Sequence, residues 1–172
     1  MIIDTHCHAG LHKYEPIQSL LYHMKEANVE KAVLIQHGGE FDNSYHVECQ
    51  NKFPGCFASA MLVRPNEGSD SIRKWADKGI VGIRLGASSR ALTSNPLEHW
   101  SSANQLDLVV SALGSPENFL SQEFSEVLQL YPNLHIVIEH LAGVESGDTE
   151  QLRSFRKVLE LAQYEQISMK LP

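Results

Sequence analysis

Residues 57–87 read FASAMLVRPNEGSDSIRKWADKGIVGIRLGA, and this stretch decides the fold. The runs at 57–65 and 80–87 are short and apolar, as buried strands are. The segment 69–79 between them is typical of a helix that ends at Gly79, because glycine accepts the left-handed conformation found after many helices. A strand, a helix and another strand in this order predict two parallel strands joined by a crossover helix.

The same alternation extends in both directions along the chain. Further apolar runs predict strands within 2–10 and at 31–38, 106–113, 135–143 and 167–172. Segments with helical spacing or helix-start signals predict helices at 16–29, 42–53, 95–105, 115–132 and 148–166. We therefore expect seven strands alternating with six helices in an α/β fold. No linker, charge block or low-complexity segment interrupts them, so residues 1–172 are expected to form a single domain.

Strict alternation leaves two architectures, the doubly wound open sheet and the TIM (β/α)8 barrel. The first strand is followed neither by G-x-G-x-x-G nor by a P-loop motif, and it ends instead in H-x-H. A barrel brings the carboxyl ends of its strands to one mouth, where catalytic residues gather. The polar residues at the strand ends are consistent with the barrel, but the alternation itself leaves both architectures open.

Composition excludes several classes of protein. The 172 residues are 42% hydrophobic and 20% charged, as in soluble globular domains, and the net charge of -7 comes without a basic stripe. Nucleic acid and anionic membranes are therefore not expected as partners. Neither a signal peptide nor a membrane span is predicted, so a cytoplasmic location is expected. Three irregularly spaced cysteines do not suggest a disulfide framework.

The opening stretch IIDTHCHAG (2–10) carries two histidines one residue apart. Side chains alternate along a strand, so His6 and His8 share a face and Cys7 takes the other. Two neighbouring imidazoles suit a divalent ion better than an isolated histidine does. The other interpretation is a chance pair at the end of a strand.

Other polar residues lie at the predicted strand ends. His140 ends the sixth strand and alternates with Ile136 and Ile138, which makes it a candidate third ligand or an electrophile; Glu139 would then face away. Alternatively, His140 is a capping or core residue. The remaining histidines, including His46 and His99, are expected at the surface.

Three residues are candidates for binding the substrate. Arg84 alternates with Gly82 and Gly86 and could reach an anionic substrate group, with a structural salt bridge as the equal alternative. Lys170 could contact a carboxylate or a developing negative charge, or lie in solvent at the chain end. Gln36 is favoured over its neighbour His37 as the inward-facing residue of the second strand.

IIDTHCH, VGIRLGA, YPNLHIVIEHLAG and ISMKLP, in this order, resemble the amidohydrolase-2 group of the amidohydrolase superfamily. That group contains metal-dependent TIM-barrel hydrolases and decarboxylases, so the resemblance implies a TIM (β/α)8 barrel-like α/β fold, truncated here after the seventh strand. The resemblance spans the whole chain, and it implies that His6 and His8 bind a divalent metal ion, with zinc as the expected metal. It gives His140 the strand-six role, as a metal ligand or as a group that polarises the substrate.

Two departures from the family pattern shape the functional expectation. Ser111 stands where many metal-binding members have a histidine, and together with the segment EFDNSYHVE this resembles the lactonase branch, some of whose members need no metal. The family's water-activating aspartate on strand eight has no counterpart before residue 172. Asp4 and Glu139 are poor substitutes in this interpretation.

The resemblance therefore implies a hydrolase that acts on a small carboxylated or cyclic ester (lactone) substrate. In it, His6, His8 and His140 polarise a carbonyl, directly or through a zinc-like ion, for attack by water. One alternative is a metal-dependent decarboxylase. The other is a non-catalytic degenerate barrel that acts as a binding or assembly module, with its edges covered by a partner or a second copy.

Overall fold

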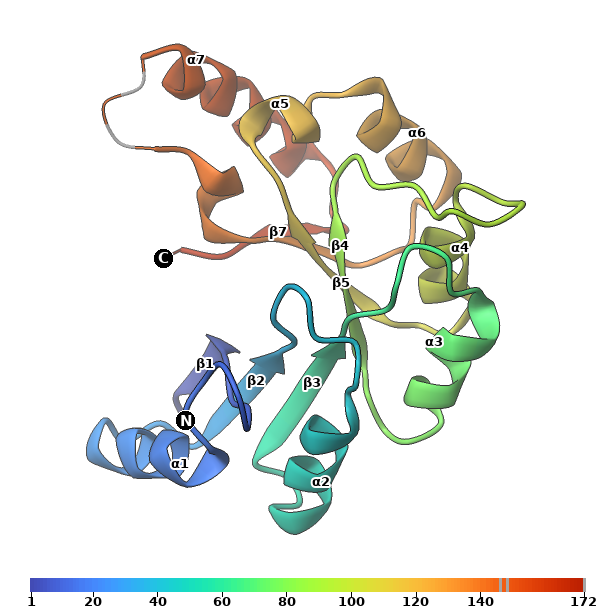
Figure 1. Ribbon diagram of the computed structural model, residues 1–172. Helices are drawn as coiled ribbons and strands as arrows, with labels where there is room; N and C mark the ends of the chain where they lie inside the picture. The colour runs from blue at the N-terminus through green and yellow to red at the C-terminus, as the bar shows by residue number, and fades with distance from the viewer. Residues whose placement is uncertain (146, 148, 172) are drawn as a thin grey trace.

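Seven parallel strands form one sheet in which each strand pairs with the next along the chain. The sheet curls into a half-barrel with helices between the strands, which confirms the expected truncated TIM-like fold (Figure 1). This computed structural model describes residues 1–145, 147 and 149–171. The strands are β1 (Ile3–Cys7), β2 (Lys31–Ile35), β3 (Phe57–Met61), β4 (Gly82–Gly86), β5 (Val109–Leu113), β6 (Ile136–Ile138) and β7 (Ile167–Met169).

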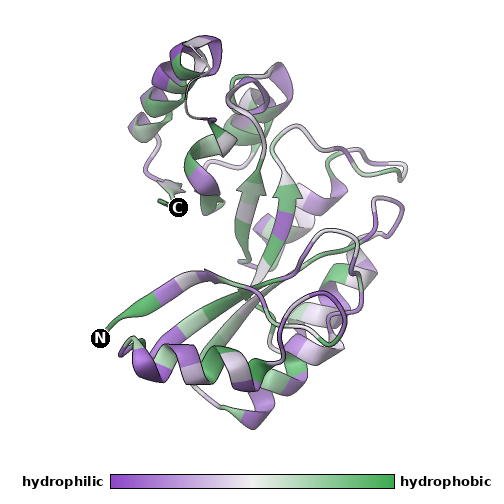
Figure 2. Cartoon of the chain, turned by 60° about the vertical axis from the view of Figure 1, so that its left-hand side comes forward, coloured by the Kyte–Doolittle hydropathy of each residue, from purple (hydrophilic) through white to green (hydrophobic). Residues whose placement is uncertain are grey.

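Helices lie on the outside of the curled sheet. They are α1 (Ile17–Glu26), α2 (Ser44–Lys52), α3 (Ser69–Ala76), α4 (Glu98–Gln105), α5 (Pro116–Phe119), α6 (Gln122–Leu130) and α7 (Thr149–Val158). Figure 2 shows that several of them carry hydrophilic and hydrophobic residues side by side, as amphipathic helices do. Their apolar side chains, such as Trp75 and Trp100, belong to the same buried core as Ile83 and Leu85 of β4.

The opposite face of each strand points into the curl. Gly82, Ser111 and Val137, from three adjacent strands, line an interior cavity of about 660 Å³. Gly82 is required where it stands, because a Cβ there would lie 2.9 Å from the carbonyl oxygen of Val109. Arg84 follows Gly82 on this inward face, as the alternation predicts.

The structure divides three predicted elements. The helix expected at 115–132 is two helices, because Ser121 interrupts it and caps α6 by accepting a hydrogen bond from the backbone N–H of Phe124. The strand expected at 135–143 is short and runs into a 3-10 turn at His140–Gly143. The helix expected from residue 148 continues beyond α7 as a 3-10 segment, Leu159–Gln163; Asp148 and Pro172 lie outside the described residues.

β1 and β7 are the two ends of the sheet, and both chain termini lie on that open side (Figure 1). The three cysteines are free, as expected. His46 and His99 were expected at the surface, but they are 1% and 6% exposed because α2 and α4 turn them inward. Within the described ranges, none of the helices has the length and apolar character needed to cross a bilayer.

Candidate active site

His6 and His8 point to the same place at the carboxyl end of β1. Their Nε2 atoms are 3.3 Å apart. The register of β1 against β2 shifts between Asp4 and Cys7, yet Cys7 still packs on the helix side of the sheet, away from both imidazoles. The structure thus brings the H-x-H pair together as the sequence predicts.

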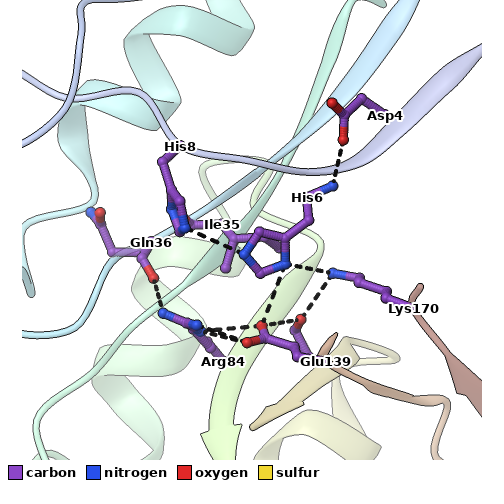
Figure 3. A network of polar contacts seen from close by, with 9 residues as sticks. Asp4, His6, His8, Ile35, Gln36, Arg84, Glu139 and Lys170 are labelled. Atoms are coloured by element: carbon purple, nitrogen blue, oxygen red, sulfur yellow. Dashed lines mark hydrogen bonds and ion pairs between the residues drawn. The ribbon is translucent and has the colours of Figure 1, made fainter. Parts of the chain in front are cut away.

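The hydrogen bonds of the two rings define their protonation. Nδ1 of His8 lies 2.7 Å from the carbonyl oxygen of Ile35, so it carries the proton and donates to that oxygen (Figure 3). Nε2 of His8 is then an acceptor, and Nε2 of His6 donates to it. His6 consequently presents an unprotonated Nδ1 on its other side, 3.4 Å from Nζ of Lys170.

Glu139 lies at the centre of the site, which corrects the expectation that it faces away. In β6 it is Val137 that lines the interior, while Ile136 and Ile138 pack under the helices. By alternation Glu139 therefore points inward with Val137. Its side chain is 1% exposed.

Every oxygen of the Glu139 carboxylate is occupied. Nε of Arg84 lies 3.1 and 3.2 Å from the two oxygens, and Nη2 of Arg84 lies 2.7 Å from Oε2 (Figure 3). The hydroxyl of Ser111 donates to Oε1 at 2.7 Å. Arg84 forms the salt bridge that was the alternative to binding an anionic substrate, and it also donates from Nη1 to the carbonyl oxygen of Gln36.

Glu139 was placed on the wrong face of β6 because the inward face was assigned from Ile136 and Ile138. The apolar residues of a barrel strand fill both faces, so Ile136 and Ile138 do not reveal which side is the interior. A usable signal was present: a carboxylate that ends an apolar strand needs a cationic partner when buried, and Arg84 ends a nearby strand.

Lys170 reaches the site from the last strand. Its Nζ lies 3.2 Å from the hydroxyl of Ser111 and donates to it. Its backbone is held by β6, because its N–H donates to Ile138 and its carbonyl accepts from the N–H of Leu141. The side chain therefore spans the open side of the barrel, from β7 to the histidine of β1.

His140 begins a strained turn. It and the next two residues, Leu141 and Ala142, have positive φ angles of 48°, 51° and 56°. This left-handed conformation costs non-glycine residues about 1 kcal/mol or more each, and such strain is often found at functional sites. The turn brings the His140 ring to 4.4 Å from that of His6, measured between ring centres.

Gln36 and Tyr14 contribute in ways that the sequence did not show. Gln36 was expected to face inward, but Val33 and Ile35 line the interior, so by alternation the Gln36 side chain takes the other face of the strand. It donates there to the carbonyl oxygen of Asp42, and only its backbone oxygen reaches Arg84. Tyr14, from the loop after β1, stacks on the ring of His8 with centres 4.5 Å apart. No strand pattern marks a loop residue, so Tyr14 could not be found by alternation.

Burial governs the protonation of the site. It lowers the pKa of His6 to about 4, although Glu139 acts in the opposite direction, and it also lowers the pKa of His8. Burial lowers the pKa of Lys170 as well. Burial would raise the pKa of Glu139, but the hydrogen bonds from Arg84 and Ser111 outweigh it and hold that pKa below its usual range. At neutral pH both His6 and His8 are therefore uncharged, and Glu139 is ionised.

The donor atoms partly fit a metal ion. Two nitrogens on a tetrahedral zinc are about 3.3 Å apart, which is the separation of the two Nε2 atoms. Ligand atoms of His6, Glu139 and His140 also lie within 4.8 Å of one another. The surrounding charges do not fit, because Arg84 and Ser111 occupy the carboxylate and the Lys170 ammonium touches His6.

Comparison with protein families settles the membership of this chain. The sequence pattern of the amidohydrolase family matches residues 3–172. The chain belongs to the amidohydrolase family. This membership confirms the resemblance drawn from the sequence. No curated protein matches this amidohydrolase.

Several solved structures share the fold of this amidohydrolase. A protein from Acinetobacter baumannii that is described as a 2-pyrone-4,6-dicarboxylic acid hydrolase and was solved with citric acid has 21% identity over 99% of this chain and 69% of its own, with a TM-score of 0.82. A Pseudomonas putida protein described by the same activity has 17% identity, covers 98% and 67%, and gives 0.80. A zinc-bound amidohydrolase from Burkholderia multivorans has 14% identity, covers 99% and 69%, and gives 0.81.

Proposed function

We propose that this amidohydrolase hydrolyses a small lactone that carries a carboxylate. The observation that carries the proposal is the convergence of His6, His8 and His140 beside two cationic side chains at one end of the barrel. An uncharged imidazole such as that of His6 can donate a hydrogen bond to a carbonyl oxygen and stabilise the negative charge that develops there as water attacks.

The charges of the site support an anionic substrate. Arg84 and Lys170 contribute two positive charges, and Glu139 contributes one negative charge. The remaining positive charge attracts a carboxylate to the mouth. The Acinetobacter neighbour binds citric acid and is described as acting on a dicarboxylic acid, which supports the same substrate class for this chain.

Activation of the attacking water needs a base that does not already accept hydrogen bonds from other side chains. Glu139 accepts hydrogen bonds from Arg84 and Ser111, so it is a poor base. Asp4 is exposed and accepts from the backbone N–H of His6. We therefore keep the sequence-based expectation that a strand-eight aspartate would serve as the base, and we propose that the described residues bind and polarise the substrate.

The zinc expected from the sequence would be held by His6, His8 and His140, and it would act there as a Lewis acid. Because the neighbouring charges do not suit it, no step of the proposed mechanism uses it. Three further expectations stay predictions of the sequence: a small-molecule substrate without nucleic-acid or membrane partners, assembly with a second copy, and a cytoplasmic location.

Calorimetric titration with 2-pyrone-4,6-dicarboxylate and with uncharged lactones tests the proposal, together with proton release as the measure of hydrolysis. We expect the carboxylated lactone to bind, and His6→Ala with His8→Ala to remove both binding and any turnover. Carbon dioxide release that depends on bound zinc would replace the proposal with the decarboxylase. Dimerisation with concentration, without binding or turnover, would replace it with the non-catalytic module.

A further inference from the structure

Lys170 occupies an unusual place for a lysine, because it lies among the groups that could hold a metal ion. Its Nζ is 3.4 Å from Nδ1 of His6 and 3.2 Å from the hydroxyl of Ser111. The hydroxyl in turn donates to Glu139, which belongs to the candidate ligand group with His6 and His140. The ammonium group thus contacts one of these three candidate ligands, His6, directly and reaches a second, Glu139, through Ser111.

Lys170 also determines which ring nitrogen of His6 carries the proton. An ammonium group has donors and no acceptor, so Nδ1 of His6 must be the acceptor in their contact. A neutral imidazole then has its proton on Nε2. A metal held between the two Nε2 atoms would need an unprotonated nitrogen from His6 as well as from His8. The arrangement in the structure supplies only the one from His8.

Electrostatics point in the same direction. In the part of the chain that the structure describes, Lys170 has no carboxylate oxygen within ion-pair distance. The charge of Glu139 is shared with Arg84 at 2.7 Å. A divalent cation beside His6 would therefore face two positive groups and one carboxylate already in use, which like-charge repulsion disfavours.

We propose that the Lys170 ammonium replaces the metal ion in this site: it excludes divalent cations and, through His6, supplies the positive charge that polarises the substrate carbonyl. The path runs from Nζ of Lys170 to Nδ1 of His6. The Nε2–H on the other side of that ring donates to Nε2 of His8 in the structure, and it would donate to the carbonyl oxygen of a bound substrate instead. The carbonyl part of this inference rests on the proposed function, whereas the exclusion of metal does not.

The test measures zinc binding by untagged protein, by calorimetry and by metal content after dialysis. The variants are Lys170→Met, Lys170→Arg, which keeps the charge, and Lys157→Met, which removes an exposed lysine from α7. Because one repelling charge is removed, we expect Lys170→Met to bind zinc about tenfold or more tightly than the wild type. Lys170→Arg and Lys157→Met should match the wild type, and adding His8→Ala to Lys170→Met should remove the gain.

Stoichiometric zinc in the wild type with the same affinity as in Lys170→Met would overturn the proposal. So would a correctly folded Lys170→Met, checked by circular dichroism, that gains no zinc affinity. Neither readout needs turnover. If no carboxylated lactone binds but Lys170→Met gains zinc, the proposed function fails and the metal exclusion stands; if such a lactone binds and no gain in zinc affinity occurs, the reverse holds.

Discussion

Arg84 and Glu139 are 55 positions apart in the chain and form a two-pronged ion pair, with Nε on both carboxylate oxygens and Nη2 at 2.7 Å from Oε2. Their side chains are 14% and 1% exposed. β4 and β6 flank β5, and Ser111 of that strand donates to the same carboxylate. The pair therefore fixes three strands at the mouth of the half-barrel, while Lys170 is the cation in contact with His6.

Glu139→Gln should lower the free energy of unfolding by about 3–5 kcal/mol, because it leaves the Arg84 charge buried without its partner. Urea unfolding measures this loss. Glu126→Gln is the matched control, since it breaks the more exposed pair with Arg90 and should cost about 0–1 kcal/mol. Equal losses in the two variants would contradict a special role for the buried pair.

His46 should make the protein less stable in acid. Burial lowers the pKa of His46 to about 4 from 6.5, so between these values the unfolded chain binds a proton that the folded chain does not. The contribution of neutral His46 to the free energy of unfolding is therefore complete above pH 6.5. It falls by about 1.4 kcal/mol per pH unit as the pH drops from 6.5 towards 4.

Unfolding by urea at a series of pH values compares the wild type with His46→Gln. The variant should lose stability less steeply between pH 6.5 and 4, whatever its stability at pH 7. The two curves should run parallel above pH 7, which serves as an internal control. Parallel curves throughout the acidic range would show that His46 does not contribute.

Gly82→Ala should destabilise the sheet by about 1–3 kcal/mol, as overpacking does. The new Cβ would lie 2.9 Å from the carbonyl oxygen of Val109 and 3.2 Å from Cβ of Ala60, and the backbone of a sheet cannot easily move. Gly38→Ala is the control, because no atom lies within 4 Å of its Cβ position. Thermal unfolding should show a clear loss for the first variant only.

Tyr14→Ala should weaken substrate binding or turnover, because the ring stacked at 4.5 Å on His8 holds that imidazole in place. Tyr14→Phe keeps the ring and should retain function, which distinguishes stacking from a role of the hydroxyl. The assay is the lactone titration and proton release described above. A loss in Tyr14→Phe as large as in Tyr14→Ala would assign the role to the hydroxyl.

The sequence predicted the parallel sheet, the shared direction of His6 and His8, and the inward direction of Arg84. These features depend on local periodicity. The alternation of strands and helices predicts the parallel sheet, and the alternation of side chains along each strand predicts the directions of the three residues. The same reasoning failed for Glu139, because a strand that is apolar on both faces does not reveal which face is the interior. It also failed for His46 and His99, whose burial depends on how α2 and α4 pack.

The sequence by itself therefore determined the order of the elements, the family and the histidines at the end of β1, since short-range pattern and motif spacing are enough for these. Only the tertiary structure decided which groups the polar side chains of the site contact. Arg84 is paired with Glu139 rather than free for a substrate, Gln36 contributes its backbone oxygen, and Lys170 contacts a histidine 164 positions away. Such contacts depend on the register and curl of the sheet, which bring distant strand ends together and which no local pattern specifies.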